Sequence, residues 1–389
     1  MNRLYHIVHL PRAYPSKLSP VSSIFFKEQV SAISQYDKTI KLGVIAIIQK
    51  PLFSNHFFNN CRLLFSSDKL HRENIITWLK YLFTVPLPYR IKRKYINFRL
   101  ILLFEKYISI YGKPDLIHLQ TYEMGAVAIK ILEKYDIPYI VTEHSSNLYN
   151  DATRNTHDFL HKIYLKSSFN IAVSPFFANY LTNKFAVPFT PIPNIVDTNK
   201  FTLKPEHTTP KVNLLHVAHC VKIKQQKLLL MGFAKALEKN PYLKLTIVGD
   251  GPELVSLKSL VIELEINNSV TFTGSLNNDD VKAQMHRADI FILTSKKETF
   301  GVVLIEALAV GLPCISTKSG GPEGIITSEE LGMLCDQNSD DIASAILLVA
   351  KNQYNSYKIR KYVTETFSPL IVGASIKKIY EEVLTRGSN

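Results

Sequence analysis

The chain has 389 residues, 46% of them hydrophobic, and a formal net charge of +13 from 46 Lys or Arg against 33 Asp or Glu. This length and apolar content predict a globular chain of two or three domains and exclude a disordered one.

Two features of the sequence bear on its compartment. No uncharged apolar run reaches 18 residues, which argues against a transmembrane helix, and the N-terminus lacks a signal-peptide core. The four cysteines are scattered without a C-x-x-C pair: Cys61, Cys220, Cys314 and Cys335. This spacing argues against a disulfide scaffold or a zinc site, and we expect a cytoplasmic protein.

The positive charge is concentrated in the N-terminal half. Residues 1–195 hold 24 Lys or Arg and 12 Asp or Glu, whereas the remainder holds 22 and 21. Such asymmetry favours an anionic partner for the first half, either nucleic acid or a membrane surface. Because no nucleic-acid-binding signature is present, we expect an anionic membrane surface and no nucleic acid.

The chain begins with an expected strand over residues 4–10, a polar loop, a helix over 24–34 and a strand over 40–48. Ser23 stands just before the helix, where N–H and hydroxyl groups suit a phosphate. An ordinary polar connection is the alternative.

A basic, aromatic-rich stretch follows within residues 51–112. It contains Arg90, Lys92, Arg93, Lys94 and Arg99 beside Tyr95, Phe98, Leu102 and Phe104. Two interpretations weigh about evenly: a segment that lies on an anionic bilayer, or the solvated face of a helix packed on the first domain.

Strands are expected over residues 114–118, 139–142 and 170–174. His144 directly follows the second of these strands, at the edge where open parallel sheets bind ligands, and His118 ends the first. We favour function for His144 and a structural role for His118. Prolines then cluster in V-P-F-T-P-I-P, which indicates a connection between domains.

The second half repeats strands and turns, with strands expected over residues 212–217, 243–248 and 270–274. The stretch from Asp289 to Glu323 reads as strand, loop, apolar helix and strand, and it carries Glu298 in the loop and Glu306 in the helix. The start of this helix suits a diphosphate, and Glu306 suits ligand hydroxyls. Helices are expected over residues 342–351 and from 369 to 384.

These motifs together carry a family resemblance. Glu298 and Glu306 in an E-x7-E spacing, with Phe300-Gly301 between them and Gly320-Gly321-Pro322-Glu323 after them, resemble the retaining nucleotide-sugar glycosyltransferases of family 4. The resemblance implies an α/β fold of the GT-B type, two Rossmann-like domains facing across a cleft. It divides the chain into an acceptor domain (1–190), a nucleotide-sugar domain (191–368) and a C-terminal helix (369–389) that crosses back to the first domain.

The resemblance also implies the site. Its catalytic residues are Glu298, His144 and Lys224. Its nucleotide-sugar-binding residues are Ser23, His219, Lys224, Gly274, Phe300, Gly301, Val302 and Glu306. Two positions depart from the family pattern: Ser23 lies where Gly is usual, and His219 replaces the Arg that grips the diphosphate with Lys224. Lys222 is the nearest candidate to supply the missing charge.

The implied function is retaining transfer of a hexose from a nucleoside diphosphate, UDP rather than GDP, to a glycan or polyprenyl-linked glycan in bacterial surface polysaccharide synthesis. No D-x-D motif is present, so we expect no metal and no cofactor besides the donor. The expected location is the cytoplasm, with peripheral contact to the inner face of the plasma membrane. A catalytically silent binding subunit and a nucleotide-sugar 2-epimerase are the alternatives.

Overall fold

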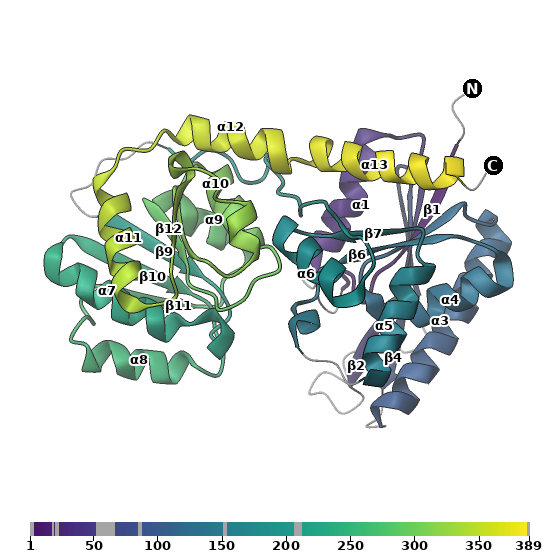
Figure 1. The fold of residues 1–389 in the computed structure, drawn as a ribbon, viewed down its shortest axis with the longest axis horizontal. Helices are drawn as coiled ribbons and strands as arrows, with labels where there is room; N and C mark the ends of the chain where they lie inside the picture. Colours follow the sequence, from purple (N-terminus) through teal and green to yellow (C-terminus); the bar gives the residue numbers. More distant parts are fainter. Residues whose placement is uncertain are drawn as a thin grey trace. The chain divides into compact units, whose positions relative to one another are not determined.

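The computed structural model describes residues 4–17, 19, 23–51, 67–84, 88–150, 154–205 and 212–386. They form two compact units (Figure 1). Unit 1 comprises Met1–Val173, Ala178–Ile195 and Pro369–Asn389, and unit 2 comprises Ser174–Phe177 and Val196–Ser368. The division follows Ile195 rather than residue 190, because β8 still pairs with β7 and the Ile192 N–H donates to the Ala172 carbonyl.

Unit 1 is built on an eight-stranded sheet in the order β3-β4-β2-β1-β5-β6-β7-β8. Its strands are β1 (His6–Leu10), β2 (Lys41–Pro51), β3 (Ser67–Arg72), β4 (Ile75–Thr84), β5 (Leu116–Leu119), β6 (Tyr139–Glu143), β7 (Phe169–Ala172) and β8 (Thr190–Pro191). All neighbours run parallel except the β3–β4 hairpin at the edge. The inner strands β1, β5 and β6 are buried throughout, as expected for a parallel sheet covered on both faces.

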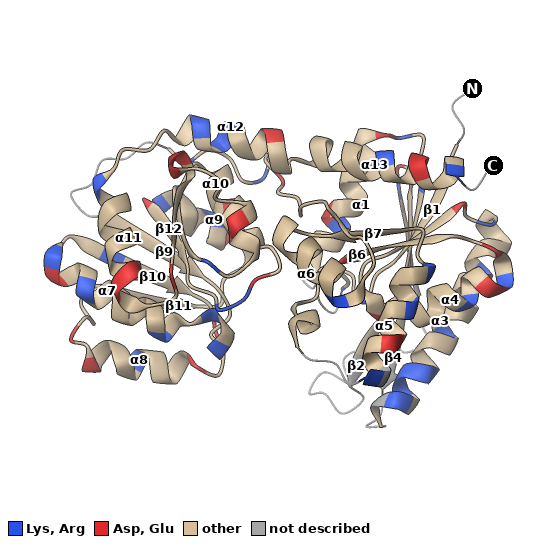
Figure 2. Ribbon diagram, in the orientation of Figure 1, with Lys and Arg blue, Asp and Glu red and all other residues tan. Residues whose placement is uncertain are grey.

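Six helices accompany this sheet: α1 (Ile24–Tyr36), α3 (Tyr89–Tyr111), α4 (Gly125–Tyr135), α5 (Arg154–Lys166), α6 (Pro175–Phe185) and α13 (Pro369–Arg386). The last helix packs closely on α1, where Gly373 allows the two backbones to approach; a Cβ there would lie 2.7 Å from the Ala32 carbonyl oxygen. Helix α3 is strongly basic (Figure 2). In the described part of the chain, no helix has the length and apolarity needed to cross a bilayer.

Unit 2 has a wholly parallel sheet in the order β11-β10-β9-β12-β13-β14. Its strands are β9 (Val212–Val217), β10 (Leu243–Val248), β11 (Val270–Gly274), β12 (Ile290–Leu293), β13 (Cys314–Thr317) and β14 (Gly332–Cys335). Its helices are α7 (Gln226–Lys239), α8 (Leu254–Glu263), α9 (Asn278–Arg287), α10 (Val302–Ala309), α11 (Ser339–Lys351) and α12 (Ser356–Phe367). Cys220, Cys314 and Cys335 are buried free thiols, and Cys61 lies outside the described residues.

Each sheet contains a point where the strand order reverses. In unit 2 the chain steps from β9 out to β10 and β11, then returns to place β12 on the other side of β9. In unit 1 the corresponding reversal lies between β1 and β5. Open α/β sheets bind ligands at the carboxyl ends of the strands beside such a reversal. Ligand sites are therefore expected at the loops after β9 and β12 in unit 2, and at the loops after β1 and β5 in unit 1.

Candidate functional site

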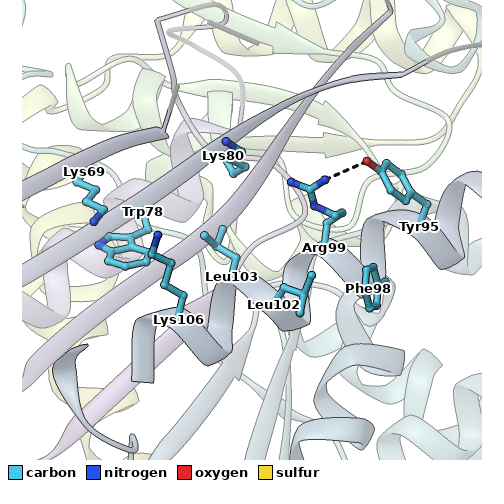
Figure 3. Close-up of a pocket in the computed structure, with 9 residues that line it drawn as sticks. All are labelled: Lys69, Trp78, Lys80, Tyr95, Phe98, Arg99, Leu102, Leu103 and Lys106. Carbon is cyan, nitrogen blue, oxygen red and sulfur yellow. Dashed lines mark hydrogen bonds between the residues drawn. The ribbon is translucent and has the colours of Figure 1, made fainter. Parts of the chain in front are cut away.

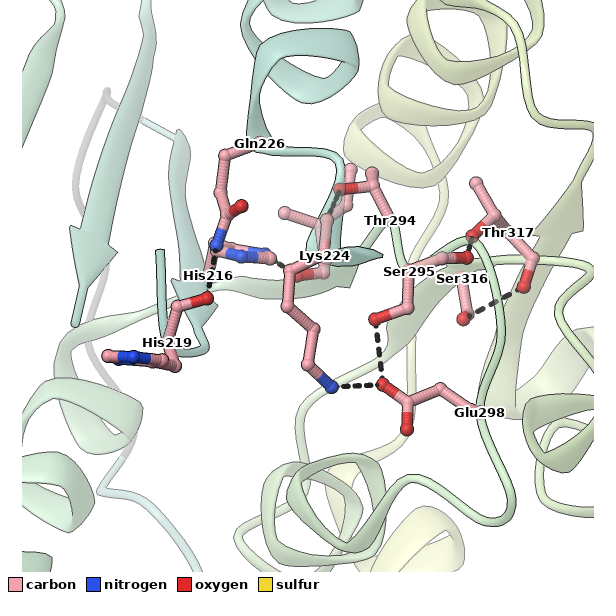
Figure 4. Close-up of polar contacts among 10 residues, drawn as sticks. His216, His219, Lys224, Gln226, Thr294, Ser295, Glu298, Ser316 and Thr317 are labelled. Atoms are coloured by element: carbon pink, nitrogen blue, oxygen red, sulfur yellow. Dashed lines mark hydrogen bonds and ion pairs between the residues drawn. The ribbon is translucent and has the colours of Figure 1, made fainter. Parts of the chain in front are cut away.

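An ion pair joins the two loops at the reversal point of unit 2. Lys224 Nζ lies 2.5 Å from Glu298 Oε1, and the Ser295 hydroxyl donates to the same oxygen at 2.7 Å (Figure 4). The side chains of Lys224 and Glu298 are only 26% and 14% exposed. Both are therefore held in place while remaining open to a ligand. This arrangement presents a cation and a carboxylate together at the carboxyl edge of the sheet.

Backbone contacts fix the loop that carries Lys224. The Thr294 hydroxyl donates to the Lys224 carbonyl at 3.1 Å, and the Lys296 N–H donates to the Ile223 carbonyl at 2.8 Å. Residues just past β12 thus clamp the short 3-10 turn Lys222–Lys224. The position of the lysine depends on the neighbouring strand as much as on its own loop.

The G-G-P-E turn supports the loop that carries Glu298. The Glu298 N–H donates to the Ser319 carbonyl at 2.9 Å, and the Gly321 N–H donates to the Glu298 carbonyl at 3.0 Å. The Glu323 carboxylate accepts from the N–H groups of Ser319 and Gly320. A Cβ at Gly321 would lie 2.3 Å from the Phe300 carbonyl oxygen, so only glycine permits this contact. The motif is a brace for the site loop.

Helix α10 begins immediately beyond Phe300. Gly301 precedes it with a φ of +105°, in the left-handed region that favours glycine, and no side chain caps the helix start. Phe300 is buried, whereas Val302 and Glu306 are half-buried. An uncapped helix start offers N–H groups and a positive dipole end to a phosphate. Glu306 lies one turn farther along the same helix.

The loop after β9 packs against the G-D-G turn after β10. A Cβ at Gly249 would lie 1.9 Å from the Ala218 carbonyl oxygen, which explains a glycine with a φ of +142° there. The Gly249 N–H donates to the Gly274 carbonyl, so Gly274 lies beside the same edge. His219 is exposed, and its ring lies apart from the Lys224–Glu298 pair (Figure 4). The His219 ring is therefore not part of this ion pair.

His144 lies in unit 1, directly after β6. Its ring packs against Phe25 and Phe26 of α1, with centroid distances of 5.0 and 5.1 Å. Burial lowers the pKa of His144 to about 3, although a hydrogen bond from its ring to Asn194 acts in the opposite direction. The imidazole is therefore neutral near pH 7. Ser23, at the start of α1, has a φ of +53°, a conformation that glycine adopts at lower cost.

The reversal point of unit 1 carries a second ion pair. Arg12 Nε lies 2.8 Å from Glu123 Oε2, and Arg93 donates to the Glu123 carbonyl at 3.1 Å. Arg12, Arg93, Glu123 and Lys92 line a hollow of about 240 Å³ at this edge. Three cations against one carboxylate make it suitable for an anion.

Two family models match the chain. Glycosyl transferases group 1 matches residues 198–366, and Glycosyltransferase Family 4 matches residues 63–200. The chain belongs to the family 4 glycosyltransferases. The first model covers nearly all of unit 2, including the Lys224–Glu298 pair and the G-G-P-E turn that braces it.

Curated relatives match this chain over part of its length. N-acetyl-alpha-D-glucosaminyl L-malate synthase of Bacillus anthracis is 32% identical over 181 residues, 45% of this chain and 47% of the relative. Alpha-monoglucosyldiacylglycerol synthase of Streptococcus pneumoniae is 28% identical over 290 residues, 64% of this chain and 63% of the relative. The chain thus spans about half to two thirds of the length of these relatives.

Solved structures agree over almost the whole chain. Sucrose-phosphate synthase from Thermosynechococcus elongatus has a TM-score of 0.77 at 18% identity, covering 98% of this chain and all of that one. Anabaena HepE, in complex with UDP and glucose, has a TM-score of 0.69 at 17% identity, covering 97% and 100%. At such low identities these likenesses show the fold alone. The fold is GT-B, as the sequence motifs indicated.

Several residues of the candidate site were not predicted from the sequence. The Ser295 hydroxyl donates a hydrogen bond to the Glu298 carboxylate. Arg12 and Glu123 meet across a reversal point that only the strand order defines. Ser295 could have been found from the sequence, because it is a polar residue at the end of a buried strand. Arg12 and Glu123 lie in the loops after β1 and β5.

His118 and Asp197 have structural roles. His118 is fully buried and bonds to Tyr380 and Thr142. The Asp197 carboxylate accepts from the N–H groups of Asn199 and Lys200 and shapes a turn. Among the residues that the structure describes, no group of three or more His, Cys, Asp or Glu is arranged to hold a metal ion.

Proposed function

We propose that this glycosyltransferase moves a hexose from a nucleoside diphosphate to a glycan or lipid-linked glycan in bacterial surface polysaccharide synthesis. The observation that carries the proposal is the Lys224–Glu298 pair at the reversal point of unit 2, beside the uncapped start of α10. UDP is favoured over GDP as the leaving group, because HepE, with the same fold, was solved with UDP and glucose.

In the proposed mechanism Lys224 and the start of α10 offset charge on the leaving diphosphate. Glu298 and the N–H groups of Phe300 and Gly301 hold the sugar hydroxyls, Val302 lies against the donor, and Glu306 holds the ribose. Gly274 borders the base. Ser23, at the start of α1 in unit 1, is a further candidate for binding phosphate. A cation and a helix start supply the electrostatic stabilisation, so we propose that transfer needs no metal and no further cofactor.

We propose that the anomeric configuration is retained. The bond from the anomeric carbon to the diphosphate breaks while the acceptor oxygen attacks from the same face. The acceptor proton passes to the departing phosphate oxygen. His144 is neutral at pH 7, with its pKa lowered to about 3 by burial, so it acts at the acceptor side as a hydrogen-bonding group rather than as a cation.

The acceptor side is proposed to carry an anionic group. The hollow lined by Arg12, Lys92 and Arg93 at the edge of unit 1 suits the phosphate of a polyprenyl-linked glycan. The basic N-terminal half suits an anionic membrane surface, where such an acceptor is embedded. One relative is named for a glucosyldiacylglycerol, a lipid product. The enzyme would then work from the cytoplasm at the inner face of the membrane.

One observation favours a second function, that of a catalytically silent donor-binding subunit. The family arginine is replaced by His219, whose exposed ring lies apart from Lys224 (Figure 4). Lys224 alone is a point charge without the two-pronged grip of a guanidinium. Donor binding without turnover on any acceptor would support this function.

The decisive experiment is thermal melting of the purified protein with UDP, GDP, CDP and ADP, each with and without EDTA. A ligand that binds only the folded state at a hundred times its Kd adds about 2.7 kcal/mol. We expect UDP to raise the melting temperature regardless of EDTA, and Lys224→Met to abolish the effect. The matched control Lys239→Met removes an exposed cation from α7 and should leave it intact.

Each other outcome has a definite meaning. A shift that disappears with EDTA would overturn metal independence. A shift with GDP instead of UDP would change the donor class and leave the site standing. No shift with any nucleotide would refute donor binding at Lys224.

A further inference from the structure

Helix α3 is the most basic element of unit 1. Over Tyr89–Tyr111 it carries six cations and one carboxylate, Glu105. Lys and Arg positions are blue along α3 in Figure 2. The cations are Arg90, Lys92, Arg93, Lys94, Arg99 and Lys106. Ionic pairing within this helix therefore leaves most of its positive charge uncompensated.

The helix has a buried face and an exposed apolar stripe. Ile96, Leu100, Phe104 and Tyr107 are buried and hold α3 on unit 1. A second set of apolar side chains is 42–57% exposed: Ile91, Tyr95, Phe98, Leu102 and Ile110. The first four of these recur at helical spacing, so they form one stripe among the cations. Exposed apolar and basic side chains on one helix are typical of an element that lies in a membrane interface.

A hollow of about 360 Å³ opens beside this stripe, between α3 and the β3–β4 hairpin (Figure 3). Four cations from three elements line it: Lys69 on β3, Lys80 on β4, and Arg99 and Lys106 on α3. Among the described residues, no carboxylate lines it. The charged side chains of the hollow can donate hydrogen bonds but cannot accept them, and such a set of donors suits an oxyanion.

Trp78 lines the same hollow with an apolar ring and one polar group, the indole N–H. It is 1% exposed, and its indole Nε1 has no hydrogen-bond partner in the described part of the chain. Lys69 Nζ lies 4.2 Å from the ring centroid, and Arg99 donates to the Tyr95 hydroxyl at 3.1 Å. A buried N–H without an acceptor is costly, so a ligand oxygen here would remove that cost.

Tyr95, Phe98 and Leu102 belong both to the lining of the hollow and to the exposed stripe. A ligand that combines a phosphate with acyl chains would therefore satisfy both features at once. A soluble phosphate would satisfy only the cations and leave the apolar stripe in water.

We infer that the outer face of α3 docks on a bilayer rich in acidic phospholipid and that the hollow binds a lipid phosphate. The inference extends the proposed function, on which it rests for the role of the membrane, by assigning the contact surface and its ligand. It does not depend on the donor site of unit 2.

Trp78 is the only tryptophan of the chain, so its fluorescence reports on the hollow alone. We expect the full-length protein, without donor, to co-sediment with phosphatidylglycerol vesicles and not with phosphatidylcholine vesicles at low salt. Brominated phosphatidylglycerol should quench Trp78 emission. The variant Arg99→Gln/Lys106→Gln should weaken vesicle binding about 25-fold, because each basic residue near an anionic surface contributes about 1 kcal/mol.

Two further variants separate charge from apolar contact. Phe98→Gln/Leu102→Gln should weaken binding to phosphatidylglycerol vesicles while the dependence on salt persists. Lys239→Gln/Lys258→Gln removes the same charge from exposed positions of unit 2 and should bind as the unaltered protein does.

Three results would overturn the inference. Equal weakening by both charge variants would mean that net charge alone attracts the protein. Binding without quenching of Trp78 would place the contact elsewhere. A response of Trp78 to free glycerol 3-phosphate equal to that with vesicles would make the hollow a site for a soluble anion. UDP protection in melting is measured separately, so a failure here leaves the donor site standing.

Discussion

At the scale of single residues, Lys224 and Glu298 have different roles in the proposed donor site: Lys224 binds the diphosphate and Glu298 binds the sugar. Their charges neutralise each other in the free protein, and Ser295 shares the carboxylate oxygen. A diphosphate would compete with Glu298 for Lys224 and release the carboxylate for the sugar. Glu298 is therefore the residue whose removal should separate nucleotide binding from transfer.

We predict that Glu298→Gln lowers sugar transfer by about 100-fold or more, the typical effect of removing one stabilising group at a reacting centre. Protection by UDP should persist, because Lys224 and the start of α10 remain. The measurements are product formation from the UDP-sugar and thermal melting with UDP. Glu263→Gln, an exposed position on α8, is the control. Loss of UDP protection in Glu298→Gln would contradict the division of roles.

Glu143, at the end of β6, is a buried carboxyl that prefers to be protonated. It accepts from the Tyr122 N–H at 2.6 Å and the Tyr164 hydroxyl at 2.9 Å. Burial nevertheless raises the pKa of Glu143 from 4.5 to about 8. Between these values the unfolded chain binds fewer protons than the folded one, so this group lowers stability as pH rises.

We predict that Glu143→Gln stabilises the protein increasingly from pH 5 to pH 8. The amide keeps an oxygen for both donors and cannot ionise, so the gain should reach on the order of a few kcal/mol at pH 8. Urea unfolding at several pH values measures it. A difference between the two proteins that stays constant with pH would mean that Glu143 does not titrate as described.

At the scale of elements, a buried chain of hydrogen bonds anchors α13 to the sheet of unit 1. Gln120 donates to His9 Nδ1 at 3.1 Å, and His9 Nε2 lies 3.3 Å from the Tyr380 hydroxyl. Tyr380 in turn lies 2.7 Å from His118 Nδ1, and His118 Nε2 lies 2.7 Å from the Thr142 hydroxyl. Neutral imidazoles satisfy every link when each donates from Nε2 and accepts at Nδ1. The C-terminal helix thereby becomes part of unit 1.

We predict that Tyr380→Phe destabilises the protein by about 1–3 kcal/mol, because two buried ring nitrogens lose their shared partner. For a unit of this size that corresponds to a fall of roughly 2–4 °C in Tm per kcal/mol. Differential scanning calorimetry measures it, with Tyr357→Phe, 68% exposed, as the control. An unchanged Tm would show that the links to His9 and His118 add nothing to the anchoring of α13.

The structure shows that helix α3 packs on unit 1, and the inference above assigns its exposed stripe to a membrane, so the two interpretations of this stretch are compatible. The buried face through Leu100 and Phe104 makes it a packed helix, and the exposed stripe through Tyr95 and Phe98 remains available to a partner. Periodicity alone did not separate the two faces, because apolar residues lie on both.

At the scale of the whole molecule, buried histidines in both units set the response to acid. Burial lowers the pKa of His9 and His144 to about 3 and of His6 and His216 to about 4, and that of His118 lies well below 6.5. Between these values and 6.5 the unfolded chain binds more protons than the folded one. Stability is therefore lost as pH falls below 6.5.

We predict that the free energy of unfolding falls steadily from pH 7 to pH 5. The Glu143→Gln background is the right place to measure it, since the opposing carboxyl is then absent. Urea midpoints at constant ionic strength give the result. Stability that is flat or rises on acidification would mean that these imidazoles take up protons in the folded state.

Much of the fold followed from the sequence. The apolar runs predicted the inner strands and the apolar helix that became α10. The family motifs predicted GT-B correctly. The edge hairpin β3–β4 was not predicted, because β3 is polar and half exposed and lacks the pattern of a buried strand.

The sequence by itself determined the buried inner strands, the family and the types of residue at the proposed donor site, because propensity, periodicity and turn chemistry are local properties. Only the tertiary structure decided which of these residues meet. Lys224 and Glu298 are 74 positions apart, and His9 and Tyr380 are 371 apart. Contacts over such separations depend on strand order and on how the loops at one sheet edge converge. The local sequence between two contacting residues does not specify that strand order.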